Sequence, residues 1–343
     1  MSHPEVLGHG AVRTAARATT LFSSDLQGDR DVRTYKQLPL EVDPPLHSVF
    51  RSILTPIFSM DRVQGLAPQF RVIVDELLAE LRVRDEIEVV SDLALELVIR
   101  CLGIVLGRPQ DVDEWRSWGP DVWITTPTGR DGSHLQAYLD ATFDEVEQQP
   151  GSDAFSVIAA ATHEGEPLSR TEMCGMGNII LAGGRDTVVK LMTGFMWHLG
   201  SVPSDYQLLA EDFTRIPRAI DELVRYLSPL PRMERVDVDG KLSADADYVW
   251  LSFISGNHDP DVFTDPHLID LQRHPNPHLG FGAGPHACIG NLIAKAETRA
   301  LLESLFTAEI RWEIVDATGI QFGTYGQSVI PDRFHSLNIR WVN

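Results

Sequence analysis

Cysteine, positive charge and long apolar runs are all scarce in this sequence. The 343 residues include three cysteines, and their odd number and wide spacing exclude a disulfide framework and favour a reducing, cytoplasmic environment. Lys and Arg total 29 against 49 Asp and Glu, so the net charge of −20 argues against a general nucleic-acid binder. The longest apolar stretch, residues 89–107, carries Asp92, Glu96 and Arg100, so we expect no membrane span. The first ten residues, MSHPEVLGHG, lack the basic and apolar regions of a secretory signal.

Hydrophobic spacing divides the chain into a helical part and a smaller β part. From about residue 44 to 228, apolar residues recur at the three-and-four spacing of amphipathic helices, with short Pro-, Gly- or Asp-rich connections. After Pro229, the segments RVDVDGKL, DYVWLSFI, AEIRWEIV and FHSLNIRWV alternate in the manner of strands, with a loop rich in proline and histidine among them. The sequence therefore predicts a mainly α protein with a smaller β portion over about 229–343.

One predicted helix is long enough to cross a whole domain. Ser169 and Glu172 match the S-x-x-E capping box, which marks a helix start. Only glycines argue against helix from there to about Leu199, a length of roughly 45 Å at 1.5 Å per residue.

A glycine pair interrupts the middle of this helix. Gly183 and Gly184 each cost about 1 kcal/mol relative to alanine in a helix interior. The pair indicates either that a large flat group lies against the helix or that the helix has a simple kink. Asp186 and Thr187 follow, and in the first case their carboxylate and hydroxyl are suited to hold a water and relay protons. In the second case they are an exposed Asp and a Thr that bonds back to its own helix.

A lone cysteine, Cys288, lies in the glycine-rich loop FGAGPHACIG at residues 281–290, directly before a predicted helix. The unpaired N–H groups and the dipole at a helix start favour negative charge, so we expect a lowered pKa for Cys288 and a thiolate. The apolar residues that indicate one buried face of this helix are Ile289, Leu292, Ile293, Ala296 and Ala300.

Four interpretations of Cys288 are open on this stretch alone. It is a nucleophile with His286 as base, although one residue separates them and no orienting acid lies nearby in the sequence. It joins His274, His278 and His286 in a zinc site, although paired C-x-x-C knuckles are missing. It is the single thiolate ligand of a haem. Or it is a buried cysteine that caps the helix.

Two further patterns are weak by themselves. Glu222 and Arg225 are three residues apart and share a helix face, and Arg273 in the later loop is a candidate third member of a buried cluster. His47 and Arg51 are four apart on one side of a helix and suggest an acidic ligand such as a carboxylate, with a solvated face as the alternative.

Taken in order, these stretches resemble the cytochrome P450 family over roughly residues 40–343. GGRDT resembles the A-G-x-[DE]-T of the central helix, with Gly183 at the usual alanine, and ELVR matches E-x-x-R. DPPLH followed by Arg51 resembles D-P-P-x-H-x-x-x-R, and NHDPDVFTDP resembles N-R-D-P-x-x-F-x-D-P, with His258 at the usual arginine. The loop matches the specific signature F-x-x-G-x-[HR]-x-C-x-G at Phe281, Gly284, His286, Cys288 and Gly290.

The resemblance implies one cytochrome P450 catalytic domain over residues 1–343, which holds haem b (iron protoporphyrin IX). Cys288 would be the iron ligand, and Asp186 and Thr187 would deliver protons during oxygen activation. The implied structural triad is Glu222, Arg225 and Arg273. The residues implied to contact the haem are His47, Arg51, Gly183, Gly184, Arg235, Phe281, His286, Cys288 and Gly290. The implied substrate pocket, mostly apolar, draws on Trp118, Trp123, Ile179, Ala182, Leu230, Met233 and Val329.

The resemblance also implies a reaction and a partner. The chain would insert one oxygen atom from O2 into a small, mostly apolar substrate, with electrons from a ferredoxin- or flavodoxin-type donor and its NAD(P)H reductase. Lys295 and Arg299 are candidates for a basic patch that meets this donor. The alternatives are a peroxygenase, a haem-dependent isomerase or dehydratase, and an inactive haem-binding protein. Only residues 1–39 precede the first motif, fewer than the family normally has, so the active site is expected to be open or covered by another subunit.

Overall fold

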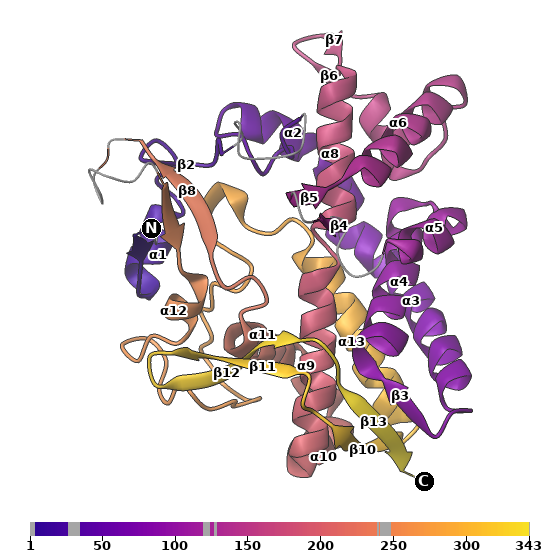
Figure 1. Cartoon of the computed structure of the whole chain (residues 1–343), viewed down its shortest axis with the longest axis vertical. Helices are drawn as coiled ribbons and strands as arrows, with labels where there is room; N and C mark the ends of the chain where they lie inside the picture. Colours follow the sequence, from indigo (N-terminus) through magenta and orange to yellow (C-terminus); the bar gives the residue numbers. More distant parts are fainter. Residues whose placement is uncertain are drawn as a thin grey trace.

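Two helices, α8 (Arg170–Ala182) and α9 (Asp186–Ser201), lie end to end and form the central column of the fold (Figure 1). Helices α3, α4 and α5 lie on one side of this column, and strands β2 and β8 lie on the other (Figure 1). The structure is a computed structural model, and it describes residues 4–26, 35–118, 124–126, 129–238, 240 and 248–342.

The predicted start of the central helix is confirmed, but its predicted continuity is wrong. Ser169 Oγ accepts a hydrogen bond from the Glu172 N–H, and the Glu172 side chain accepts one from the Ser169 N–H, so the capping box is complete. Residues 183–185 then separate α8 from α9. The two glycines weaken the helix at this point. The buried Arg185 turns away and donates from Nη2 to the Trp115 carbonyl at 3.1 Å, which ties the break to α5.

Most of the remaining helices lie in the predicted helical range of about residues 44–228. Helix α13 follows the Cys288 loop as predicted, whereas α1 and α12 were not predicted. The π-helical turn Val89–Leu95 leads directly into α4, and the 3₁₀ turn Thr55–Phe58 extends the helix before it. The helices outside the central column are α1 (His9–Ala15), α2 (Leu46–Leu54), α3 (Met60–Leu81), α4 (Glu96–Leu106), α5 (Val112–Ser117), α6 (Ser133–Gln148), α7 (Ala154–Ala159), α10 (Pro203–Glu211), α11 (Ile216–Leu227), α12 (Phe253–Asn257) and α13 (Asn291–Thr307).

The strands form one four-stranded sheet, one three-stranded sheet and hairpins. The four-stranded sheet has the order β1-β9-β8-β2, with β1 parallel to β9, and the three-stranded sheet has the order β10-β13-β3. The strands are β1 (Glu5–Val6), β2 (Phe22–Ser23), β3 (Glu86–Glu88), β4 (Ile124–Thr126), β5 (Gly129–Asp131), β6 (Thr162–His163), β7 (Glu166–Pro167), β8 (Met233–Asp237), β9 (Tyr248–Leu251), β10 (Arg311–Asp316), β11 (Ile320–Tyr325), β12 (Ser328–Phe334) and β13 (Asn338–Val342).

Two details of the β portion differ from the prediction. The segment DYVWLSFI is a strand only to Leu251, because α12 begins at Phe253. The hairpin of β11 and β12 was not predicted, since Gly323, Pro331 and the polar turn around Gly326 obscure its alternation. The four predicted strand segments otherwise overlap β8, β9, β10 and β13, although β8 begins two residues before its segment and β10 ends one residue after its segment.

A single large core joins the helices around the central column. Phe70 of α3, Leu97 of α4, Phe143 of α6, Phe195 of α9 and Leu301 of α13 are all fully buried in it. Each such side chain contributes about 1.5–3 kcal/mol relative to exposure, so these contacts stabilise the column from several directions. A smaller cluster packs α1 against β9 and α12. Among the described residues, each helix is too short or too polar to cross a membrane.

The buried face of α13 is rotated relative to the prediction. Ile293 and Ala300 are buried as expected, but Leu292 and Ala296 are only half-buried. Glu297 takes a place in the buried face, and burial raises the pKa of its carboxyl. Apolar spacing alone misses this rotation because the pattern counts a carboxylate as polar and therefore as exposed.

Candidate haem site

The loop that carries Cys288 is closed by its own backbone. The Cys288 N–H donates to the Phe281 carbonyl at 2.8 Å, and Asn291 Nδ2 donates to the Cys288 carbonyl at 2.7 Å. A 3₁₀ turn at Gly284–His286 precedes the cysteine, and α13 begins three residues after it with Gly290 as the N-cap residue. Gly284 has φ of +72°, and a Cβ there would lie 2.5 Å from the Ala16 carbonyl oxygen, so the tight turn requires glycine.

The protein alone raises the pKa of the Cys288 thiol, and the expectation of a lowered value is wrong. Burial is the main cause, although the N–H groups of Gly290 and Asn291 and the charge of Arg51 act in the opposite direction. The side chain is accessible to solvent, yet enough protein atoms surround the sulfur for desolvation to prevail over these interactions. A thiolate at this position therefore depends on a metal ion that displaces the proton.

Four basic side chains from three parts of the chain lie close together near this loop. His47 and Arg51 come from α2, Arg235 comes from β8, and His286 comes from the loop itself. The rings of His47 and His286 are 4.4 Å apart. Burial, with help from the other three charges, lowers the pKa of His286 to about 3, and burial lowers the pKa of Arg235 to about 10. The chain has thus gathered four basic groups, and Asp43, with an oxygen 3.8 Å from His286 Nε2, is a nearby carboxylate that partly compensates their charge.

The hydrogen-bond partners of these basic side chains indicate whether the side chains are suited to hold a haem. His47 is 2% exposed, and neither of its ring nitrogens has a hydrogen-bond partner among the described residues. A buried polar group without a partner costs free energy, so both nitrogens are suited to an acidic ligand. Arg51 also interacts electrostatically with Cys288, which puts the basic cluster beside the sulfur. A haem would fit this donor set, because its two propionates are carboxylates and its iron can take a thiolate ligand.

The glycine pair and the two residues that follow lie at the break of the central column. A Cβ on Gly184 would meet no atom within 4 Å, so open space lies beside it. A Cβ on Gly183 would lie 2.8 Å from the Ile179 carbonyl oxygen, which favours glycine there. Asp186 is the first residue of α9 and is exposed, whereas Thr187 is half-buried. An exposed carboxylate next to a half-buried hydroxyl is a suitable route for protons from solvent.

The structure brings Glu222, Arg225 and Arg273 together in a buried cluster. Arg225 Nε and Nη2 each donate to a Glu222 oxygen at 2.8 Å, and Arg273 Nε donates to both oxygens at 3.0 and 3.1 Å. Asn276 Nδ2 and the Asp270 N–H complete the contacts to the same carboxylate. Glu222 and Arg225 are fully buried, so this cluster ties α11 to the loop before Cys288.

The predicted substrate residues come from several elements and differ in burial. Trp118 and the α8 residues Ile179 and Ala182 are partly buried and pack against the main core, whereas Met233 packs against the smaller cluster near α1. Trp123 lies outside the described residues. Leu230 and Val329 remain accessible, at 38% and 59% exposed.

Two of the open interpretations of Cys288 lack support. Among the described residues, no group of three or more His, Cys, Asp or Glu side chains is arranged to hold a metal ion, which disfavours the zinc site. His278 instead lies 3.4 Å from Asp221. His286 Nε2 lies 3.0 Å from Ser24 Oγ, so this ring is not held as a base against the sulfur.

Two residues that hold the site in place, Ser24 and Arg185, were not predicted from the sequence. The buried Ser24 holds His286, and its own N–H donates to Asp43 at 3.0 Å, so residues before α2 help to orient the Cys288 loop. Arg185 fixes the break between α8 and α9 through Trp115. The DPP segment contained Asp43, but nothing local in the sequence indicated its long-range partner.

This chain is similar to known proteins in sequence and in fold. A profile of the family described as Cytochrome P450 matches residues 211–320. Nocardicin C N-oxygenase of Nocardia uniformis subsp. tsuyamanensis is 32% identical over 78% of this chain and 71% of its own length. Cytochrome P450 monooxygenase PikC of Streptomyces venezuelae is 31% identical over 88% of this chain and 76% of its own length. The solved structure of a carbohydrate active P450 is 32% identical, with a TM-score of 0.85 over 98% of this chain and 91% of that one.

The fold and the similarity together define a haem-thiolate protein built on two sheets and a broken central helix. The chain belongs to the cytochrome P450 family. It is an enzyme of the monooxygenase type, an oxidoreductase.

Proposed function

We propose that this chain binds haem b through Cys288 and inserts one oxygen atom from O2 into a small, mostly apolar organic substrate, with electrons from a separate donor. The observation that carries the proposal is His47, which is buried beside His286 of the cysteine loop with both ring nitrogens unpartnered among the described residues. A propionate carboxylate would be a hydrogen-bond partner for such ring nitrogens, and the thiolate of Cys288 would be a ligand of the haem iron. The related oxygenases support the reaction class.

Each predicted residue then has a physical task. His47, Arg51, Arg235 and His286 would hold the two propionates by charge-assisted hydrogen bonds. Cys288 Sγ would ligate the iron, with the N–H groups of the α13 start stabilising its charge. When bound, the haem supplies dioxygen activation and oxygen transfer, and thiolate ligation favours O–O cleavage.

Asp186 and Thr187 would move protons from solvent into the site. The exposed Asp186 carboxylate is suited to take up a proton from water, and the Thr187 Oγ1 hydroxyl is suited to pass it inward. The bend at residues 183–185 frees backbone groups at this point, and Arg185 keeps the bend fixed through the Trp115 carbonyl. Gly184 leaves space for the cofactor beside the same turn.

Members of the family act on substrates of different chemistry. Relatives named for nocardicin C, steroids and linalool share this family, so the common fold does not select one compound. The proposed pocket residues Leu230 and Val329 lie in loop and hairpin segments, where related enzymes differ most. Their accessible side chains are suited to an apolar ligand.

Spectroscopy of the reconstituted protein tests the proposal. Protein loaded with hemin and reduced under carbon monoxide should show the red-shifted band of thiolate-ligated haem, and pyridine extraction should identify haem b. With a ferredoxin, its reductase, NADPH and O2, oxygen consumption should depend on the enzyme. Protein that takes up no haem would contradict the proposal, and turnover with hydrogen peroxide but not with O2 would favour the peroxygenase alternative.

The electron donor requires a docking surface near the cysteine loop. The predicted basic patch of Lys295 and Arg299 is altered by ion pairs. Lys295 Nζ lies 2.6 Å from Asp221, and Arg299 Nε lies 2.6 Å from Glu303, so both predicted cations are largely neutralised. Arg218 on α11 is exposed and has no ion pair or hydrogen bond within the described part of the chain. We therefore propose Arg218 as a cation that an acidic donor meets.

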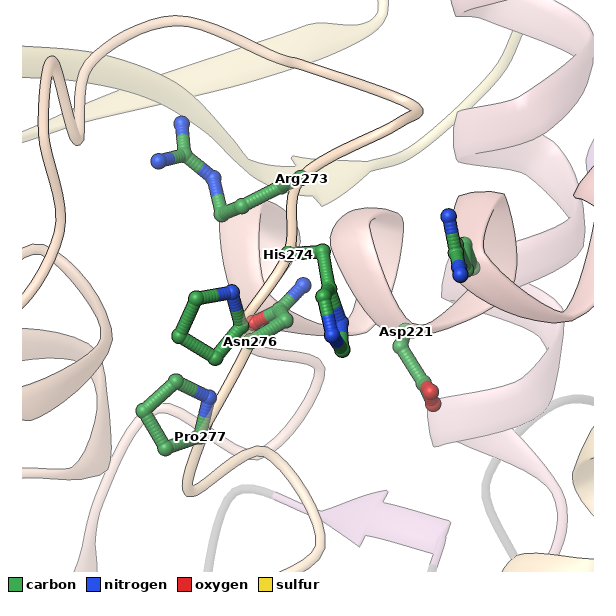
Figure 2. A pocket seen from close by; sticks show the side chains of 7 residues that line it. Asp221, Arg273, His274, Asn276 and Pro277 are labelled. Atoms are coloured by element: carbon green, nitrogen blue, oxygen red, sulfur yellow. The ribbon is translucent and has the colours of Figure 1, made fainter.

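Arg218 borders a surface pocket of about 330 Å³ between α11 and the loop before Cys288. In Figure 2, Asp221 projects from α11, while His274, Asn276 and Pro277 lie on the facing loop. Arg273 turns its guanidinium away from them in the same view (Figure 2). Its Nε lies 3.0 Å from a Glu222 oxygen. A second pocket also includes Arg218, so the cation lies between two depressions that a partner's side chains can fill.

Charge reversal at Arg218 should slow reduction of the haem by an acidic ferredoxin. For Arg218→Glu we expect a rate about threefold to tenfold lower at low ionic strength, because attraction between opposite charges accelerates encounter. Stopped-flow reduction under carbon monoxide measures the rate, and the difference should shrink in high salt. Arg82→Glu, at the exposed end of α3, is the matched control. Equal rates for wild type and Arg218→Glu, or equal slowing by Arg82→Glu, would reject this surface.

A further inference from the structure

His258 is buried where the resembled motif has arginine, and it joins two parts of the chain that are far apart in sequence. It is 7% exposed, at the end of α12. Its Nε2 lies 2.9 Å from the Tyr226 carbonyl oxygen, and its Nδ1 lies 2.8 Å from Ser328 Oγ. Tyr226 belongs to the last turn of α11, and Ser328 is the first residue of β12.

These two contacts determine which ring nitrogen carries the proton. A carbonyl oxygen only accepts, so Nε2 must be the N–H that donates to Tyr226. Burial lowers the pKa of His258 to about 4, and the ring is therefore neutral near pH 7. In a neutral ring the other nitrogen accepts, so the Ser328 hydroxyl donates to Nδ1. Ser328 is 2% exposed, which makes this hydrogen bond inaccessible to competing water.

The last turn of α11 also holds Val329, the hairpin residue after Ser328. The Tyr226 hydroxyl donates to the Val329 carbonyl at 3.3 Å, and the Tyr226 and His258 rings are 5.5 Å apart. Ser328 and Ile330 are buried, whereas Val329 between them is 59% exposed. Because few side-chain contacts restrain Val329, its position depends on backbone and neighbours that Tyr226 and His258 fix. The hairpin lies against the α11 and α9 region in Figure 1.

We propose that His258 is a positioning residue for substrate selection, because it fixes the tip of the β11–β12 hairpin, and Val329 with it, through Ser328. The inference rests on the proposed function in one respect, namely that Val329 borders the substrate pocket. His258 itself touches neither substrate nor cofactor in this role. It acts through the position of the hairpin. Its replacement therefore changes which ligands fit the substrate pocket and leaves the ligation of the iron unchanged.

The variant Ser328→Ala removes only the hydroxyl that His258 holds. Ser304→Ala is its matched control, since Ser304 is also 2% exposed and donates to Asp75 from the distant α13. His258→Leu removes both contacts, whereas His258→Asn keeps an amide oxygen near the place of Nδ1 and should partly rescue the hairpin. If His258→Leu does not fold, Ser328→Ala still decides the matter.

Two measurements on haem-loaded protein test the inference. Hydrogen exchange should accelerate in residues 324–331 of Ser328→Ala by about threefold to tenfold, and should be unchanged there in Ser304→Ala. The ratio of the dissociation constants of 4-phenylimidazole and imidazole, read from the haem absorption, should also change about threefold to tenfold in Ser328→Ala. The larger probe extends farther from the iron than the smaller one, so its affinity depends more on the walls of the pocket.

The outcomes separate this inference from the proposed function. If every variant shows the thiolate carbon monoxide band but neither the exchange rate nor the ratio moves in Ser328→Ala, the role of His258 is wrong and the proposed function stands. If wild-type protein lacks the band, the proposed function is wrong, and the role in substrate selection is lost with it. Faster exchange without a changed ratio would limit His258 to stability and overturn its role in selection.

Discussion

The variant Cys288→Ala is expected to lose the thiolate carbon monoxide band completely and to have no monooxygenase turnover above background. Of the three cysteines, Cys288 is the one beside the basic cluster, whereas Cys101 and Cys174 are buried in the core. No histidine takes its place, since His286 is held by Ser24. The reduced, carbon monoxide-treated spectrum and NADPH-dependent oxygen consumption measure both losses.

Cys174→Ala is the control for this result. Cys174 on α8 is 1% exposed, and its thiol lies 3.6 Å from an Asp140 oxygen, so its removal affects packing but not the iron. This variant should keep the band of the wild type. A persistent thiolate band in Cys288→Ala, or its loss in Cys174→Ala, would refute the assignment of the iron ligand.

The parts of the site that could be predicted are those with short-range patterns. The loop of Cys288, the E-x-x-R pair of Glu222 and Arg225, and the i,i+4 pair of His47 and Arg51 each depend on residues a few positions apart. Spacing on one helix or in one turn decides their geometry, so the sequence alone indicates it. Family resemblance then supplied the long-range association among these stretches.

Features that depend on contacts across the fold could not be predicted. The break before α9 involves Arg185 and the Trp115 carbonyl, which are 70 residues apart. Likewise, His258 depends on Ser328, and nothing near either residue indicates the other. The pKa of Cys288 was misjudged because a helix start was visible in the sequence, whereas the burial that outweighs it was not.

Replacement of Glu222 on α11 by glutamine should strongly destabilise the attachment of this helix to the loop before Cys288. The substitution keeps the size of the side chain but leaves Arg225, which is fully buried, and Arg273, whose side chain is 9% exposed, without their shared carboxylate. Removal of one partner from a buried ion pair typically costs about 3–5 kcal/mol, because the other charge remains unpaired in a poorly solvated place. We expect Glu222→Gln to be recovered with little haem and to unfold at markedly lower denaturant concentration.

Asp221→Asn, one residue away, separates this effect from a general loss of charge on α11. Asp221 is 33% exposed, and its pair with Lys295 is only partly shielded from water, so its loss should cost no more than about 1 kcal/mol. Denaturant unfolding and haem content, measured side by side for the two variants, distinguish them. The buried carboxylate of Glu222 holds α11 to the loop through two arginines, whereas Asp221 contacts Lys295 and His278 at a partly exposed place. Equal unfolding midpoints for Glu222→Gln and Asp221→Asn would show that the buried cluster does not hold the cysteine loop in place.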